Sequence, residues 1–212
     1  MNLLLSLSRV IDNTTERIGR TIYWLVLVAV LISAANAVVR KAFNYSSNSF
    51  LEIQWYLFSL IFLFCAGYAL KENDHVRIDI ITGRMSARVR AMIDIFGTLF
   101  FLLPMAVLIM VLSWPVFVDA WTRNEVSTNA GGLVIWPARL MVPIGFFLLI
   151  VQAISELIKR IAFLKGLIPD PSEKHVAKTA EEELAEEILR ARGERAIAEE
   201  IEGIALGKVN KP

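Results

Sequence analysis

Four long runs of apolar residues, each free of charged side chains, set the pattern of this chain. They occupy residues 21–39, 53–70, 95–118 and 140–155. A helix needs about 20 residues to cross a bilayer core of about 30 Å. A soluble protein in which 20% of the residues are charged would rarely keep four such runs clean. The pattern therefore predicts four membrane-spanning helices, at about residues 21–39, 52–70, 91–115 and 140–164.

The N-terminal residues 1–20 carry a separate helical pattern. Their apolar side chains recur at steps of three, four or seven residues: Leu3, Leu4, Leu7, Ile11 and Ile18. This spacing predicts an amphipathic helix that lies at the membrane surface before the first span; a frayed N-terminus is the alternative. Arg17 and Arg20 ahead of an apolar run are also typical of a signal peptide, but this run is long enough to span a membrane.

Capping residues and helix breakers divide the runs. Ser49 and Glu52 fit a capping box at the start of the second span, and Ser86 is expected to cap the third. The third run has 24 residues and would be about 36 Å long as a helix. We therefore expect it to tilt, and Pro104 should kink it. Residues 114–138 are too apolar for a free loop and too rich in proline and glycine for a span. We expect them to pack at the interface or against a partner.

Lysine and arginine are unevenly distributed between the two ends of the spans. Eleven lie in the N-terminal segment, in the loop between the second and third spans, or at the end of the fourth span, whereas the other two loops hold four. Loops rich in these residues stay in the cytoplasm, so both termini are predicted to be cytoplasmic. Four of the five tryptophans then fall near the outer face, as in an interfacial aromatic belt.

Composition separates a membrane domain, residues 21–168, from a charged tail, residues 169–212. Hydrophobic residues make up 56% of the chain, whereas residues 172–212 hold ten acidic and seven basic side chains. The tail is predicted to form an amphipathic helix, which either contacts a partner or is simply solvated. The predicted fold class is all-α: an integral membrane four-helix bundle with tilted spans, interfacial amphipathic segments and a cytoplasmic C-terminal helical tail.

Few residues in the chain are suited to chemistry. His75 and His175 lie outside the predicted spans, so they do not form a pair of haem ligands inside a bundle. Cys65 is the only cysteine, which excludes a redox pair within the chain. We find no hydrolase, metalloprotease or phosphate-loop motif, and we predict neither enzyme activity nor a cofactor or metal. No basic stripe with interleaved aromatics suggests nucleic acid. Because the span interiors carry no charge, a transport pathway is expected on a partner chain.

Ten polar or aromatic residues are candidates for a partner interface. They are Glu52, Gln54, Trp55, Arg77, Asp79, Asp94, Glu125, Ser127, Arg139 and Gln152. Simpler interpretations exist for several of them. Glu52 and Asp94 fit acidic groups at helix N-termini, Arg77 and Asp79 fit solvated interfacial charges, and Glu125 and Ser127 fit a loop turn. Gln152 can hydrogen-bond to a helix of this chain or of another subunit.

Short segments in a fixed order resemble a known family. They are EIQWY at 52–56, YALKENDHVRID at 68–79, Trp121, EVS at 125–127, WP at 136–137 and PIGF at 143–146. Together they resemble the small membrane subunit, of the DctQ type, of tripartite ATP-independent periplasmic (TRAP) transporters. The resemblance covers about residues 13–165, and HVRID is its most specific part. It does not include the tail.

The resemblance implies a role that the residues alone do not give. Such a subunit lies in the bacterial inner membrane with both termini in the cytoplasm. It pairs with a large membrane (DctM-type) subunit that carries the substrate and sodium sites. Membrane lipids surround the two subunits. A soluble periplasmic substrate-binding protein delivers the substrate, typically an organic acid, and an ion gradient drives uptake. The alternative is a stand-alone structural or regulatory four-span membrane protein, which the charged tail suggests.

Overall fold

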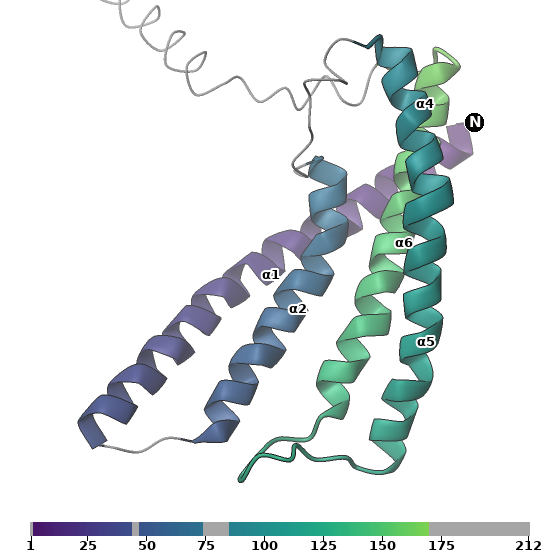
Figure 1. The fold of residues 1–212 in the computed structure, drawn as a ribbon. Coiled ribbons are helices and arrows are strands. Elements are labelled where there is room, and N and C mark those ends of the chain that lie inside the picture. The colour runs from purple at the N-terminus through teal and green to yellow at the C-terminus, as the bar shows by residue number, and fades with distance from the viewer. Residues whose placement is uncertain (1, 44–46, 74–84, 170–212) are drawn as a thin grey trace, which may run out of the picture. The chain divides into compact units, whose positions relative to one another are not determined.

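The computed structural model describes residues 2–43, 47–73 and 85–169. The elements in these ranges are α1 (Asn2–Phe43), α2 (Asn48–Glu72), α4 (Ala87–Gly97), the π-helix η1 (Thr98–Leu102), α5 (Leu103–Thr122) and α6 (Trp136–Leu164) (Figure 1). Four helical stretches are long and apolar enough to cross a membrane: α1, α2, the continuous α4–η1–α5, and α6. The prediction of an all-α protein with four spanning helices is confirmed. The predicted helical tail, residues 169–212, lies outside the described residues apart from residue 169.

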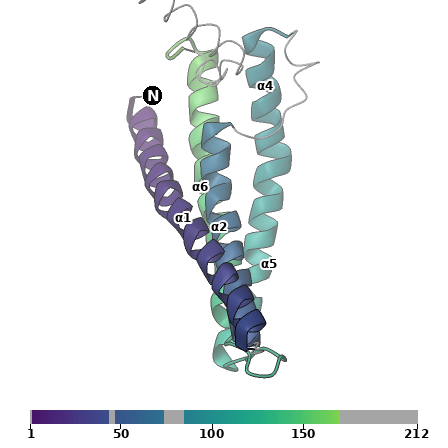
Figure 2. The same ribbon diagram turned by 90° about the vertical axis from the view of Figure 1, so that its left-hand side faces the viewer.

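Helix α6 is the centre of the arrangement. It packs against α1, α2, α4 and α5, and α1 also packs against α2. Figure 1 shows consecutive helices running in opposite directions, and Figure 2 shows α1 crossing the face of the others at a steep tilt. In the most hydrophobic stretch of α6, 33% of the residues are buried, against 6% in the other three spanning stretches. We call the end where α2 begins and residues 123–135 lie the loop end, and the opposite end, where α1 begins, the N-terminal end.

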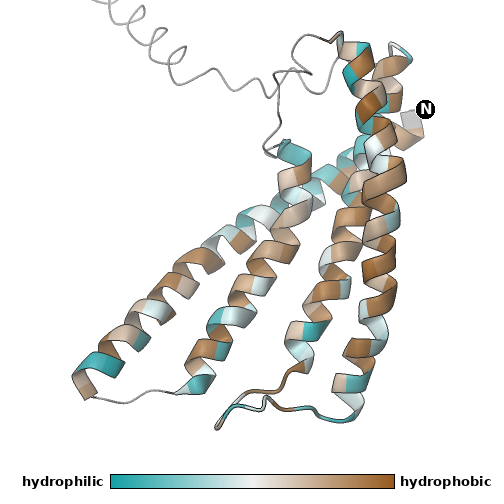
Figure 3. Ribbon diagram, viewed as in Figure 1, coloured by the Kyte–Doolittle hydropathy of each residue, from teal (hydrophilic) through white to brown (hydrophobic). Residues whose placement is uncertain are grey.

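Small side chains form the contacts between the helices. The buried hydrophobic residues are Ile22, Ala91, Ala106, Ala120, Ala153 and Ala162. At Gly145 of α6, an added Cβ would lie 2.7 Å from the Cβ of Leu63 in α2. Small residues let membrane helices approach closely. Many large apolar side chains are instead exposed, which suits contact with lipid or another subunit. Figure 3 shows hydrophobic residues along all of the helices.

The N-terminal segment differs from the prediction in one respect. It does not form a separate helix but continues into the first span as α1, a single helix of 42 residues. Its length is about 63 Å at 1.5 Å per residue, more than the roughly 40–45 Å of a whole bilayer. The segment is amphipathic, with its polar face toward α6: Ser8 is 1% exposed, whereas Leu3 and Val10 are 80% and 60% exposed. Contact of the apolar face with the membrane surface stays a prediction.

The third span is longer than predicted at both ends. It runs from Ala87 to Thr122, over 36 residues. The expectation that residues 114–138 are too broken for a span is wrong for the part up to Thr122, because Pro115 lies inside α5. It is also wrong for residues 136–138, which form the first turn of α6 with Pro137. The π-helix η1 comes just before Pro104, which has no N–H to donate. The helix thus continues past Pro104 with locally widened hydrogen bonding, and the kink itself stays a prediction.

Two predicted helix caps are not formed by side chains. Helix α2 begins at Asn48 after Ser47 as N-cap, with no capping side-chain hydrogen bond, so the capping box of Ser49 and Glu52 is wrong. Ser86 occupies the N-cap position of α4 as predicted, but its hydroxyl does not cap the helix. Asp94 lies beyond the first turn of α4, because that helix starts at Ala87. The side chains of Glu52 and Asp94 are used in contacts between elements instead.

Candidate functional site

The first polar cluster lies at the loop end and is built around Glu52. This carboxylate is only 3% exposed. One oxygen accepts hydrogen bonds from the Ser127 hydroxyl and from Asn129 Nδ2, the latter at 2.9 Å. The other oxygen accepts the backbone N–H of Leu133 at 2.6 Å. A buried charge is tolerated when hydrogen bonds satisfy it, and here all three donors come from the loop between α5 and α6. We call Glu52 and these three donors the loop cluster.

The loop that supplies these donors has a short, defined fold. Val126 and Val134 form an antiparallel bridge, and the Ser127 N–H donates to the Leu133 carbonyl at 2.9 Å. Gly131 has a φ of 72°, which favours glycine. Gly132 lies so close to Ser127 that an added Cβ would be 2.5 Å from the Ser127 Cβ. The turn is therefore narrow, and its geometry aims several donors at one carboxylate.

Other side chains of α2 hold the same loop. Asn48 Nδ2 donates to the Ala130 carbonyl at 3.0 Å, the Ser49 hydroxyl donates to the Gly131 carbonyl, and the Tyr56 hydroxyl donates to the Val134 carbonyl at 2.9 Å. The first turns of α2 thus bind the loop through four side chains, counting Glu52.

A forked ion pair joins the loop to α6. The guanidinium of Arg139 donates to both carboxylate oxygens of Glu125, at 2.5 Å and 2.8 Å. Fork geometry of this kind is both strong and specific in direction. The two side chains are 30% and 39% exposed, so the pair is accessible at the loop end. Glu125 and Ser127 do lie in a turn, as one interpretation of the sequence predicted, and each has a partner elsewhere in the chain.

The second polar cluster joins α1 to α6 near the N-terminal end. Ser8 and Ser155 share a hydrogen bond of 2.7 Å. The Gln152 amide, 0% exposed, donates to Asp12 Oδ1 at 2.9 Å and accepts the Thr15 hydroxyl at 2.8 Å. These partners of Gln152 lie within this chain, which agrees with one of its two interpretations. Contact of Gln152 with another subunit stays a prediction.

Ion pairs extend the second cluster to the neighbouring helices. Lys159 contacts Asp12 at 3.0 Å and Glu156 at 2.5 Å. Arg160 of α6 contacts Asp94 of α4 at 2.6 Å. We call Ser8, Asp12, Thr15, Gln152, Ser155, Glu156 and Lys159 the α1–α6 cluster. A buried charge destabilises strongly when its partner is lost, so these contacts select one alignment of α1, α4 and α6.

A further ion pair joins α1 to α2 at the same end. Lys71 Nζ lies 2.9 Å from Glu16 and 3.1 Å from Glu72, and Arg20 Nη2 lies 2.5 Å from Glu16. Each helix that approaches the N-terminal end in the described part of the chain is thus connected to a neighbour by opposite charges.

The ten predicted interface residues fall into three groups. Six make side-chain contacts within the chain: Glu52, Asp94, Glu125, Ser127, Arg139 and Gln152. Trp55 is 63% exposed on α2, beside the half-buried Gln54. Arg77 and Asp79 lie outside the described residues. A role of any of these residues in binding a partner stays a prediction.

Sequence reasoning missed Asp12, Lys159 and Arg160. Their positions in the sequence could have indicated them. Asp12 lies on the polar face of an amphipathic helical pattern, and Lys159 and Arg160 interrupt the end of the fourth apolar run. Charges inside an apolar helix need a partner, but the pattern does not identify which one.

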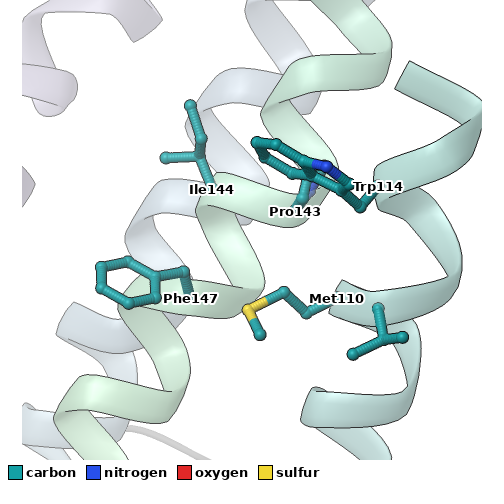
Figure 4. A pocket seen from close by; sticks show the side chains of 6 residues that line it. Met110, Trp114, Pro143, Ile144 and Phe147 are labelled. Atoms are coloured by element: carbon teal, nitrogen blue, oxygen red, sulfur yellow. The ribbon is translucent and has the colours of Figure 1, made fainter. Parts of the chain in front are cut away.

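The described residues offer little for binding a solute. They contain no group of three or more histidine, cysteine, aspartate or glutamate side chains able to hold a metal ion. A pocket of about 490 Å³ lies between α5 and α6, and Figure 4 shows side chains that line it. Its lining is apolar: Met110, Val111, Trp114, Pro143, Ile144 and Phe147. Such walls suit hydrocarbon rather than a carboxylate.

The fold and these clusters define a multi-pass membrane protein whose polar groups join its own helices. Residues 17–163 match the sequence model of the family described as "Tripartite ATP-independent periplasmic transporters, DctQ component". The chain belongs to this family, and it is therefore a small membrane subunit of a TRAP transporter. No curated protein matches the chain. Membership implies in general that it associates with the other components of such a transporter in the inner membrane.

Proposed function

We propose that this chain braces the large, DctM-type membrane subunit of a secondary uptake system for organic acids. In this proposal an ion gradient drives uptake, the large subunit carries the substrate and ion sites, and the loop end helps to dock the periplasmic substrate-binding protein. The observation that carries the proposal is the distribution of charge. Polar clusters join neighbouring helices at the N-terminal end and join α2 to the α5–α6 loop at the other end, while the apolar runs between them contain no charged residue.

The uncharged interiors support the absence of a solute pathway in this chain. Ionisable groups within membrane helices typically mark ion or substrate routes. Here Glu156, Lys159 and Arg160 lie in the last turns of α6, and each contacts a charged partner. A carboxylate substrate crossing the membrane would meet no cation on the way within the apolar runs.

The joined ends support the role of a brace. The α1–α6 cluster, the Arg160–Asp94 pair and the Lys71–Glu16 pair connect neighbouring helices at the N-terminal end. The loop cluster connects α2 to the α5–α6 loop at the other end. A support for a moving partner needs an arrangement that resists distortion, and buried hydrogen-bonded networks supply it.

The loop end is the proposed docking face for the binding protein. The bias of Lys and Arg toward the N-terminal end favours both termini in the cytoplasm, so that the loop end faces the periplasm. The loop is held in one shape before any partner arrives, which reduces the entropy lost on docking. The Arg139–Glu125 pair and Trp55 are accessible there.

Reconstitution tests the proposal. The large subunit is placed in liposomes with and without this chain, the binding protein loaded with an organic acid is added outside, and uptake is measured with and without an inward sodium gradient. We expect uptake only when both membrane subunits and the gradient are present. Equal uptake by the large subunit alone would contradict the role of a brace. Failure of the tagged chain to retain a larger multi-span protein would instead favour the stand-alone alternative.

A further inference from the structure

A second pocket, of about 360 Å³, lies between α1 and α2. Its lining includes Gly19, Arg20, Tyr23, Trp24, Cys65 and Tyr68. Unlike the pocket in Figure 4, it combines apolar and aromatic walls with a cation.

Close packing at Gly19 forms one wall of the pocket. The Tyr68 ring lies directly against the α1 backbone, since an added Cβ at Gly19 would be 2.7 Å from Tyr68 Cγ. One turn further along α1, the side chains of Tyr23 and Trp24 are 72% and 66% exposed and pack edge to face. The helices therefore touch at Gly19 and leave room beside the two exposed rings.

The pocket lies where α1 changes from charged to uncharged. Residues 16–20 contain three charged side chains, and residues 21–39 contain none. This change marks the boundary between headgroups and hydrocarbon, where tyrosine and tryptophan are enriched. A molecule in the pocket would thus have its apolar part beside Tyr23, Trp24 and Cys65, and its polar part beside Arg20.

Arg20 is available to an anion at this boundary. Its side chain is 75% exposed, and Glu16 contacts it through one nitrogen, Nη2. A guanidinium has five N–H donors in a planar fork that suits phosphate. Lys71 Nζ lies nearby, 5.9 Å from the centre of the Tyr68 ring, but it is already paired with Glu16 and Glu72, so Arg20 is the cation that the pocket offers to a ligand.

We propose that this pocket is a binding site for an anionic phospholipid. One acyl chain fills the space between α1 and α2, and Arg20 holds the lipid phosphate. The apolar and aromatic walls of the pocket suit an acyl chain, and the charge of Arg20 suits an anionic headgroup. Both lie at the depth in the membrane where a lipid carries these two parts. The site depends on the membrane setting of α1 and α2 and not on the transport role of the subunit.

Fluorescence quenching tests this site. In the full-length chain, the other four tryptophans are replaced by phenylalanine so that Trp24 alone reports. The protein is placed in nanodiscs containing increasing fractions of phosphatidylglycerol or of phosphatidylcholine, each with brominated acyl chains. We expect half-maximal quenching at an about fivefold lower fraction of phosphatidylglycerol, the factor expected for one cation at a membrane surface.

Three variants make the test specific. Arg20→Gln should abolish the preference for phosphatidylglycerol, and Cys65→Phe, which fills the pocket, should reduce quenching by both lipids. Arg123→Gln is the matched control, because Arg123 also pairs with an acid four residues earlier and is also 75% exposed, but lies at the loop end. It should keep the preference.

Three results would overturn the proposal. Equal quenching by the two lipids, or an unchanged preference in Arg20→Gln, would mean ordinary contact with surrounding lipid. Loss of quenching when the large subunit is bound would mean that a protein segment occupies the pocket. Arg20→Gln alters an exposed side chain, so the test does not depend on whether Cys65→Phe folds.

Discussion

Glu52→Gln should release the α5–α6 loop without unfolding the helices. Glutamine keeps the shape of the side chain but places an NH₂ donor where a carboxylate oxygen now accepts. At least one of the three hydrogen bonds to Glu52 is then lost, and a donor of the loop is left unpaired in a site where the carboxylate is 3% exposed. Hydrogen bonds to charged groups contribute about 1.5–3 kcal/mol each. We expect the docking of the loop to weaken by about 3 kcal/mol.

Hydrogen–deuterium exchange measures this change directly. The Leu133 N–H donates to Glu52 Oε2 and reports the contact itself, and the Ser127 N–H reports the turn. A weakening of 3 kcal/mol would speed exchange at these amides by roughly a hundredfold. The full chain is measured in nanodiscs, with Gln54→Ala as the control, because Gln54 is a polar residue of α2 outside this set of hydrogen bonds.

Either of two outcomes would contradict this role of Glu52. If Leu133 exchanges at the same rate in Glu52→Gln as in the unaltered protein, Glu52 does not hold the loop. If exchange rises equally throughout α2 and α6, Glu52 stabilises the whole fold and not the loop alone. The predicted result is faster hydrogen–deuterium exchange in the loop, with unchanged exchange in the helices. Gln54→Ala should not show this change.

Three further predictions concern packing, orientation and the tail. Gly145→Ala should destabilise the protein by about 1–3 kcal/mol in thermal unfolding, because the added methyl group meets α2 at 2.7 Å; Gly97→Ala, with nothing within 4 Å, is the control and should unfold at an unchanged or higher temperature. In a cysteine-free background, a cysteine at Ser127 should react with an impermeant reagent in intact cells, and one at Ser86 only after permeabilisation; the reverse would overturn the orientation. Deletion of residues 172–212 should leave reconstituted uptake intact, and loss of uptake would assign the tail an essential role.

The ends of the helices were harder to predict than their existence. The predicted third span stopped at about residue 115 because proline usually ends or kinks a helix. The structure continues to Thr122, since a proline inside a long apolar helix forfeits one hydrogen bond, whereas unwinding the helix in hydrocarbon would expose many. A similar reason explains why residues 1–20 do not form a separate helix: nothing between them and the first span interrupts the helical hydrogen bonds of α1.

The sequence by itself determined that this chain has four helices long and apolar enough to cross a membrane, because uncharged runs of sufficient length reflect the thickness of the bilayer core. It also contained the family segments, which the match over residues 17–163 supports. Only the tertiary structure decided the partners of the polar side chains. Glu52 is bound by residues 75 to 81 positions away, and Asp12 meets Lys159 across 147 positions. Helical periodicity relates residues three or four apart, whereas such distant contacts depend on how the helices cross, which the close packing of small residues decides.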